Sequence, residues 1–359
     1  MNILYILTSY NLYGGTPKKT LDLLKSFQER SSLYLYTPAY EEFKYLFEET
    51  NANIYEGLYR RKIWKHIQKI VEIIDRDKID IIQTQFSFGE ILGVLVKRKR
   101  PHIKLVVSFE TPLTPTGVRK YILPKFYSHV DRFIYISDYV KREKEKNFPI
   151  LKNKKTKIIF NGTDKLISNK STVPNLKTFS LLDVAGLSDW KNIKTLVEMM
   201  KLLIYKYNRT DIHLYVAGDG DERENLEMQI KEYGIENNIH LLGNQSNVLG
   251  LLKQADIFVH PSYKEGFGIV ILEAMIEAKP IIVSNAGALP EIIEENVSGF
   301  LVDPFDIEQW AKTVLKLIDD KDLSKKIGLQ AQEIVKEKFS IEEYVVKHKK
   351  LYEEVMENV

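Results

Sequence analysis

Short apolar runs alternate with amphipathic stretches in the first half of the chain, which is typical of a parallel sheet covered by helices. The run Asn2–Thr8 is expected to form a buried strand, and Gly14-Gly15-Thr16-Pro17 a turn into a helix with Thr16 as its cap. A further helix is expected at 62–74. The other strands expected in this half are Ile79–Ile82, Leu105–Val107 and Phe133–Ile136.

The pattern restarts after the polar stretch Lys165–Lys177, which has the composition of a linker. We therefore expect two α/β domains with parallel, Rossmann-like sheets, residues 1–168 and 169–340. A closing helix within 341–359 is expected to pack back on the first domain, although periodicity alone does not decide this. The strands expected in the second domain are Phe179–Val184, His213–Ala217, His240–Leu242, Ile257–His260 and Pro280–Val283.

Composition agrees with an ordinary globular protein of this size. Of its residues, 44% are hydrophobic and 28% are charged, close to globular averages. A chain of 359 residues is longer than a single hydrophobic core usually supports, which indicates two domains. The absence of cysteine excludes a disulfide framework, a thiolate zinc site and a cysteine nucleophile. No apolar run approaches the roughly 18 residues of a membrane-spanning helix, and the N-terminus lacks the basic leader of a signal peptide. We expect a soluble, cytoplasmic protein.

The stretch Pro261–Met275 is the most informative part of the chain. It directly follows an expected strand, and ligands bind at the carboxyl ends of the strands in open parallel sheets. Within it, Ile269–Ile276 is apolar at every position except Glu273, which predicts a helix buried on nearly all sides. A buried carboxylate needs a hydrogen-bonding partner, which either the protein or a ligand must supply.

Two glycines, Gly266 and Gly268, bring bare backbone N–H groups to the start of this helix. The helix dipole favours an anion such as phosphate at that place. Glu265 stands just before the glycines. The structural alternative is a strand-to-helix turn with a capping acid and a core glutamate paired with a lysine, and two glycines alone do not decide between these interpretations.

Two glutamates eight positions apart, in the setting Glu-Gly-Phe-Gly followed by Leu-Glu-Ala-Met, resemble the signature of retaining glycosyltransferases of the GT-B fold, family 4 (the group 1 family). Matches to that family continue in order over nearly the whole chain. The resemblance implies two Rossmann-like domains that face each other across a cleft. The other matching segments are Gly14-Gly15, Ile159–Asp164, Leu187–Lys191, Val216–Gly220, Leu241–Gly243, Gly287–Glu291 and Ser298–Val302.

The resemblance implies transfer of a sugar from a nucleotide diphosphate sugar, most commonly a UDP-sugar, with retained anomeric configuration. Glu273 would bind the ribose hydroxyls, Glu265 the hydroxyls of the donor sugar, and Lys191 the diphosphate. Gly14 and Gly15 would close on the phosphate or the acceptor from the first domain. The supporting backbone groups would be those of Gly266, Phe267, Gly268 and Ile269. Because preorganised N–H groups and a cation stabilise the leaving diphosphate, we expect neither a cofactor nor a metal ion.

Two positions depart from the family. Where it usually carries a histidine near the reacting sugar, this chain has Glu110. Glu110 could act in catalysis by accepting a hydrogen bond or a proton, or it could merely cap the turn before Pro112. Where the family usually has an arginine beside the lysine, this chain has Gly186, so one charge partner of the diphosphate is missing.

Metal-binding motifs are weak. Asp219-Gly220-Asp221 imitates an Asp-X-Asp metal motif, but a glycine-containing turn after a strand is the simpler interpretation. The 7 histidines are dispersed, and we expect most of them to be structural or exposed.

Positive charge is concentrated in the first domain, because residues 1–170 hold 31 Lys and Arg against 18 Asp and Glu. A solvated face is one explanation. Docking on an anionic membrane is the other, since each basic residue near such a surface contributes about 1 kcal/mol. Nucleic acid is not expected, because no nucleic-acid-binding motif accompanies the charge. The clusters are Arg60–Lys65, Lys97–Arg100, Arg119–Leu123 and Lys152–Lys155.

The sequence thus predicts a metal-independent, retaining hexosyltransferase that acts on a glycan or lipid-linked acceptor in cell-surface polysaccharide biosynthesis. It is expected in the cytoplasm, with peripheral docking at the inner leaflet as a hypothesis. The alternative is a non-catalytic nucleotide-sugar binding protein of the same descent, motivated by Glu110 and Gly186. A dinucleotide dehydrogenase would need Gly-X-Gly-X-X-Gly after the first strand, which is absent.

Overall fold

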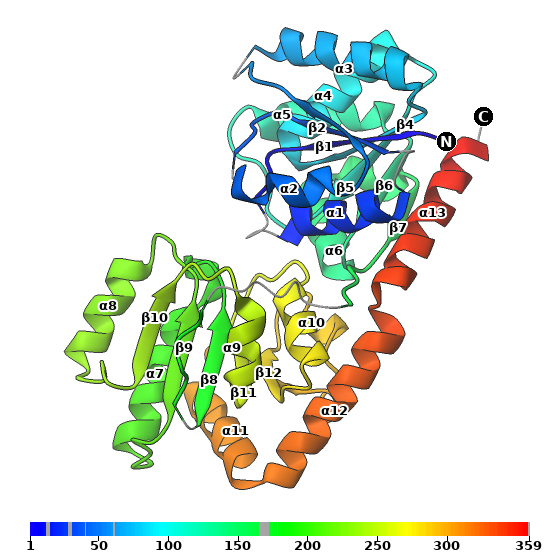
Figure 1. Cartoon of the computed structure of the whole chain (residues 1–359). Helices are drawn as coiled ribbons and strands as arrows, with labels where there is room; N and C mark the ends of the chain where they lie inside the picture. Colours follow the sequence, from blue (N-terminus) through cyan, green and yellow to red (C-terminus); the bar gives the residue numbers. More distant parts are fainter. Residues whose placement is uncertain are drawn as a thin grey trace. The chain divides into compact units, whose positions relative to one another are not determined.

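The computed structural model describes residues 1–11, 15–27, 31–39, 41–59, 62–164, 172–177 and 179–357. It divides into two compact units (Figure 1). Unit 1 comprises Met1–Asn161 together with Ile341–Val359, and unit 2 comprises Gly162–Ser340. The chain therefore leaves unit 1 after Asn161 and returns to it at Ile341.

Unit 1 contains a seven-stranded sheet in the order β3-β2-β1-β4-β5-β6-β7, in which every pairing is parallel. From β1 the chain moves outward to β2 and β3 and then crosses to β4 on the other side, so the strand order reverses between β1 and β4. The strands are β1 (Ile3–Leu7), β2 (Ser31–Leu35), β3 (Asn53–Glu56), β4 (Ile81–Gln85), β5 (Lys104–Phe109), β6 (Arg132–Tyr135) and β7 (Thr156–Ile158).

Helices cover both faces of this sheet (Figure 1). The last helix belongs to the same core as the first strand, because Leu351 and Tyr352 pack with Ile3 and Tyr5. The Tyr352 hydroxyl donates to Gln83 Oε1 at 2.7 Å and lies 3.3 Å from the Tyr5 hydroxyl. The helices are α1 (Gly15–Phe27), α2 (Lys44–Glu48), α3 (Ile63–Asp77), α4 (Phe86–Lys99), α5 (Arg119–Phe126), α6 (Asp138–Asn147) and α13 (Ile341–Glu357).

Unit 2 contains a six-stranded parallel sheet in the order β10-β9-β8-β11-β12-β13. Its strands are β8 (Ser180–Val184), β9 (His213–Ala217), β10 (Ile239–Gly243), β11 (Ile257–His260), β12 (Ile281–Ser284) and β13 (Phe300–Val302). Its helices are α7 (Ile193–Tyr205), α8 (Arg223–Glu232), α9 (Val248–Gln254), α10 (Ile269–Ile276), α11 (Ile307–Asp319) and α12 (Lys321–Lys338). Both sheets are of the α/β, Rossmann-like kind that the sequence predicts.

Local sequence explains where several unit 2 helices begin. The side chains of Asn247, Asp306 and Asp320 each accept a hydrogen bond from a backbone N–H in the first turn of the helix that follows. Such caps satisfy donors that have no partner inside the helix and contribute about 1 kcal/mol each. Two of these helices, α11 and α12, then bury apolar residues in the core that contains the fully buried Trp310.

Several predicted elements occur with the expected bounds, including β9, β11 and α10. The sequence analysis missed β2, β3, β7 and β13, which are short or begin with polar residues such as Ser31 and Ser32. It also placed the start of the first helix too late, because α1 begins at Gly15, ahead of the expected cap Thr16. Within the described part of the chain, none of the helices has the length and apolar content to cross a lipid bilayer.

The close packing of α12 on the turn after α10 yields a test of this fold. A Cβ atom added at Gly328 would lie 2.0 Å from the carbonyl oxygen of Ala278, whereas one added at Gly89 in α4 would meet its neighbours at 3.6 Å or more. We expect Gly328→Ala to lower the free energy of unfolding by about 1–3 kcal/mol, because backbone would have to move. The control Gly89→Ala should change stability by less than about 1 kcal/mol in urea denaturation. Equal effects would contradict the packing.

Candidate functional site

The loops that follow β8 and β11 lie side by side, because these strands are neighbours in the unit 2 sheet. The first loop ends in a short 3-10 turn, Asp189–Lys191. The carbonyl oxygen of Trp190 in this turn accepts hydrogen bonds from Ser262 Oγ at 3.1 Å and Tyr263 N at 3.0 Å. These bonds fix the turn against the segment that leads to Glu265.

Asn192 completes the connection between the two loops. Its φ of 58° lies in the left-handed region, which asparagine tolerates better than most residues. The buried side-chain amide donates to the carbonyl oxygens of Pro261 at 3.3 Å and Pro304 at 2.8 Å. Asn192 therefore turns the chain into α7 and at the same time links three loops of unit 2.

Four titratable side chains form a row at this place. Lys191 Nζ lies 2.5 Å from Glu265 Oε2, and His260 Nε2 lies 3.1 Å from the same oxygen. The other ring nitrogen, His260 Nδ1, lies 2.8 Å from Asp183 Oδ1. The side chains of Asp183 and His260 are fully buried, whereas those of Glu265 and Lys191 keep 14% and 21% of their surface exposed. The row thus runs from the interior to the surface.

The surroundings of Glu265 keep it ionised. Burial would raise the pKa of this carboxyl, but the opposing effects of Lys191 and His260 are together larger, so the pKa falls well below its ordinary range. Burial would likewise lower the pKa of His260, and the Asp183 carboxylate outweighs it, so the pKa of His260 rises above its ordinary value. At neutral pH the site therefore presents an ionised Glu265, whose carboxylate contacts Lys191 Nζ and His260 Nε2.

The segment after Glu265 leads directly into α10. Phe267 is buried, and Gly268 has a φ of 93°, which favours glycine at the residue before the helix. Gly287 lets a second loop approach closely, since a Cβ there would lie 2.6 Å from the Glu265 carbonyl oxygen, and Ala288 N donates to that oxygen at 2.9 Å. The predicted helix start at Ile269 is confirmed.

Glu273 lies inside α10 and is only 5% exposed, as its position in an apolar helix predicts. Lys191, Glu265, the 266–269 segment and Glu273 therefore all belong to unit 2, and Lys191 and Glu265 are in contact. Gly15 and Glu110 belong to unit 1. Gly15 is the first residue of α1, and Gly14 lies outside the described residues.

Glu110 follows β5 directly and is partly buried. Ser108 Oγ donates to its Oε1 at 2.5 Å. Burial raises the pKa of Glu110 to about 7, although the hydrogen bond from Ser108 lowers it. The carboxyl group is therefore able to change its protonation state near neutral pH, which a general acid or base requires.

A second buried carboxyl group, which the sequence analysis missed, lies in unit 1. The hydroxyl of Tyr127 donates to Glu90 Oε2 at 3.0 Å, and burial raises the pKa of Glu90 to about 7. Burial lowers the pKa of Lys144 to about 8, and its ammonium group donates to the carbonyl oxygen of Leu113 at 2.5 Å. Lys144 thereby anchors the loop that follows Glu110.

Gly186 and Asp219 lie at the ends of adjacent strands. A Cβ at Gly186 would meet Asp219 O at 3.8 Å, an ordinary contact, so the position has room for a side chain. The Asp219 side chain accepts a hydrogen bond from Gly220 N at 2.8 Å and lies 3.7 Å from Arg223. These contacts agree with the interpretation of Asp219-Gly220-Asp221 as a turn.

Asp183 and His260 escaped the sequence analysis. The signal for Asp183 was a single acid inside the apolar strand β8, and that for His260 was its position immediately before Pro261. The histidines are also less dispersed than expected, because His240 Nε2 and His213 Nδ1 lie 3.4 Å apart on neighbouring strands. Among the described residues, no group of three or more candidate metal ligands occurs.

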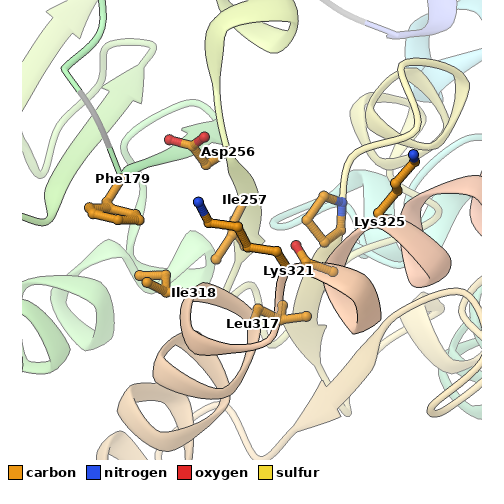
Figure 2. A pocket seen from close by; sticks show the side chains of 9 residues that line it. Phe179, Asp256, Ile257, Leu317, Ile318, Lys321 and Lys325 are labelled. Carbon is orange, nitrogen blue, oxygen red and sulfur yellow. The ribbon is translucent and has the colours of Figure 1, made fainter.

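A hollow of about 340 Å³ lies elsewhere in unit 2, near the amino ends of β8, β11 and β12 (Figure 2). Its residues are therefore distinct from those of the row around Glu265. Figure 2 shows the nitrogen end of the Lys321 side chain pointing toward Asp256. Its lining residues are Phe179, Asp256, Ile257, Pro280, Leu317, Ile318, Lys321, Ser324 and Lys325.

Comparison with protein families gives two adjacent matches. Residues 13–165 match the model described as Glycosyltransferase Family 4, and residues 164–334 match the model described as Glycosyl transferases group 1. An uncharacterized glycosyltransferase of Methanocaldococcus jannaschii is 27% identical and covers 99% of both chains. The N-acetyl-alpha-D-glucosaminyl L-malate synthase of Bacillus anthracis is 26% identical over 80% of this chain and 78% of its own length.

Solved structures agree in fold. HepE of Anabaena in complex with UDP and glucose has a TM-score of 0.84 at 21% identity and covers 99% of this chain and 100% of its own. Sucrose-phosphate synthase from Thermosynechococcus elongatus has a TM-score of 0.79 at 17% identity, with 100% of both chains covered. The fold class predicted from the sequence, GT-B, is confirmed.

The titration of Glu110 predicts a pH-dependent stability. A carboxyl whose pKa is raised on folding to about 7 stabilises the fold at pH values below its unfolded pKa, and this contribution is lost as the pH rises through 7. The wild type should therefore lose stability relative to Glu110→Gln between pH 5 and pH 8. The difference between their free energies of unfolding should change by roughly 1–3 kcal/mol in favour of the variant. Glu72→Gln, at an exposed position in α3, is the control. Parallel pH curves for both variants in urea denaturation would contradict the raised pKa.

Proposed function

The chain belongs to the group 1, family 4 glycosyltransferases, and on that premise we propose that it moves a hexosyl group from a UDP-sugar to a glycan or lipid-linked acceptor with retention of configuration. The reaction would take place in the cytoplasm, and its product would be used to build a cell-surface polysaccharide. HepE has been solved with UDP-glucose, and the pneumococcal O-GlcNAc transferase GtfA with UDP and GlcNAc. These complexes support the choice of UDP.

The observation that carries the proposal is the ion pair between Lys191 and Glu265 just ahead of α10. In the proposed complex, Lys191 binds the diphosphate and the backbone N–H groups of 266–269 support it, because charge develops on this leaving group. Glu265 accepts hydrogen bonds from hydroxyls of the donor sugar, and Glu273 from those of the ribose. The stabilising charge then comes from a lysine and amides, so that no metal ion is required.

Unit 1 supplies the acceptor side in this proposal. Gly14 and Gly15 contact the phosphate or the acceptor, and Glu110 accepts a hydrogen bond or a proton at the reacting sugar. Its pKa of about 7 suits either role. The competing proposal is a nucleotide-sugar binding protein without turnover, which is favoured by Gly186, since this position provides no cation. Measuring both binding and turnover separates the two.

A thermal-shift screen with UDP, GDP, ADP and their sugars tests the proposal. We expect UDP and at least one UDP-sugar to raise the melting temperature, because a ligand that binds only the folded state stabilises it. Glu273→Gln should weaken UDP binding about 10–100-fold, since one charge-assisted hydrogen-bond acceptor is lost. Glu265→Gln should leave UDP affinity within about threefold and slow release of UDP from the donor instead. Unchanged binding and kinetics in both variants would refute the assignment.

Gly186 offers a gain-of-function test of where the diphosphate lies. Because the position tolerates a side chain, Gly186→Arg should fold normally and add a cation. If Gly186 faces the diphosphate, this variant should bind UDP several-fold more tightly than Gly186→Gln, which adds a neutral side chain of similar length. Titration calorimetry measures both. Equal affinities for the two variants would place the diphosphate elsewhere.

We also propose that unit 1 docks on an anionic membrane surface. Exposed apolar side chains, Trp64, Val118 and Tyr121, lie among the basic residues at the starts of α3 and α5. Of the other basic clusters, Lys97 pairs with Asp131 and Arg100 with Asp75, so those charges are partly neutralised within the protein.

Sedimentation with vesicles that contain phosphatidylserine tests this docking. The wild type should bind at low salt, and Lys120→Glu at the start of α5 should bind more weakly, because the reversal removes attraction at the proposed surface. Lys152→Glu makes the same charge change in the 3-10 segment before β7 and should have a smaller effect. Equal loss in both variants would indicate attraction by net charge alone, and no binding by the wild type would overturn the docking proposal.

A further inference from the structure

We propose that Asp183 and His260 are a positioning pair that keeps Glu265 ionised and aligned after Lys191 has turned from Glu265 to the donor diphosphate. This inference rests on the proposed function, because it assigns the pair a task within the transfer reaction. It concerns the two fully buried members of the row, to which the sequence analysis assigned no role.

The geometry around the His260 ring requires a particular protonation state. Nδ1 faces Asp183 Oδ1 at 2.8 Å and Nε2 faces Glu265 Oε2 at 3.1 Å. Neutral imidazole has one N–H group, so it can donate to only one of two ionised carboxylates, whereas imidazolium donates to both. With both carboxylates ionised, the arrangement therefore specifies His260 as a cation with two N–H groups.

The two cations beside Glu265 differ in their freedom to move. Lys191 has a long side chain that is 21% exposed and approaches from a 3-10 turn, so its ammonium group can turn toward an arriving anion. His260 is fully buried on β11, and its ring stacks on Phe258 with centroids 6.3 Å apart. When the diphosphate attracts Lys191, His260 stays in place.

This difference solves a charge problem at the site. One lysine cannot neutralise both Glu265 and a diphosphate, and a largely buried carboxylate that loses its cation either takes up a proton or destabilises the site. With His260 as a second cation, Glu265 remains an acceptor for sugar hydroxyls after Lys191 has moved. Lys191 is then available to bind the diphosphate.

The contacts of the Asp183 side chain are directed to His260. The carboxylate is fully buried on β8, and its Oδ2 has no hydrogen-bond partner among the described residues. Its Oδ1 contacts His260 Nδ1. The charged groups placed around the ring are thus Asp183, Glu265 and Lys191, from three different segments. Of these, Asp183 and Glu265 favour the imidazolium form, and Lys191 opposes it.

The decisive measurement is the protonation state of His260 in the wild-type protein. Selective isotope labelling of the 7 histidines, followed by NMR at pH 6 to 9, should show one imidazolium with both N–H groups at pH 7.5. Its absence from the spectrum of His260→Gln assigns the signal. In Asp183→Asn the same ring should lose its proton at least one pH unit lower. A neutral His260 in the wild type at pH 7.5 would overturn the inference without any need for the Asp183 variant to fold.

Kinetics give a readout that a purely structural role would not change. For Asp183→Asn, the alkaline limb of the kcat profile should move to lower pH by at least one unit, while UDP affinity at pH 6 stays within about twofold. His260→Gln, which keeps a neutral donor, should retain about tenfold more kcat than His260→Leu, which has none. Identical pH profiles for wild type and Asp183→Asn refute the positioning pair alone. If the wild type neither binds UDP nor releases it from a donor, the proposed function fails, and the pair loses its task with it.

Discussion

The ion pair between Lys191 and Glu265 is the interaction on which the candidate site of unit 2 depends. Its two members come from different loops, 74 residues apart in sequence, and meet because β8 and β11 are adjacent strands. The backbone bonds at Trp190 then fix the distance between the loops. The order of the strands therefore determines which charged side chains meet at the carboxyl edge of the sheet.

The electrostatics of the site follow from the depth at which each member lies. Charge is tolerated at Asp183 and His260, in the interior, because each group has an opposite charge beside it. Toward the surface, Glu265 and Lys191 gain access to solvent and thus to a ligand. A buried pair of this kind stabilises little by itself, since the cost of removing both charges from water offsets their attraction. In the proposed role, the Asp183–His260 pair instead keeps the neighbouring Glu265 ionised.

Periodicity predicted the elements that form clear apolar runs and missed several that contain polar residues. The helix α10 was predictable because seven of its eight residues are apolar. The strands β9 and β11 were predictable because each is an apolar run between polar loops, which leaves little choice of where the strand begins and ends. By contrast, β3 and β7, the two edge strands of the unit 1 sheet, mix polar and apolar residues, so no apolar run marks them. The roles expected for Glu265 and Lys191 came from a family resemblance. The contact of Glu265 with Lys191, and that of His260 with Asp183, depend on strand order, which local sequence does not encode.

The return of the chain to unit 1 at Ile341 has a consequence for biosynthesis. The core around β1 includes Tyr344, Leu351 and Tyr352, which are translated after all of unit 2. Unit 2 is contiguous and can acquire its full core while translation continues, but unit 1 must wait for α13. The usual order, in which the amino-terminal half matures first, is thus reversed, and a nascent chain that stops before Ile341 would hold an incomplete unit 1 and a complete unit 2.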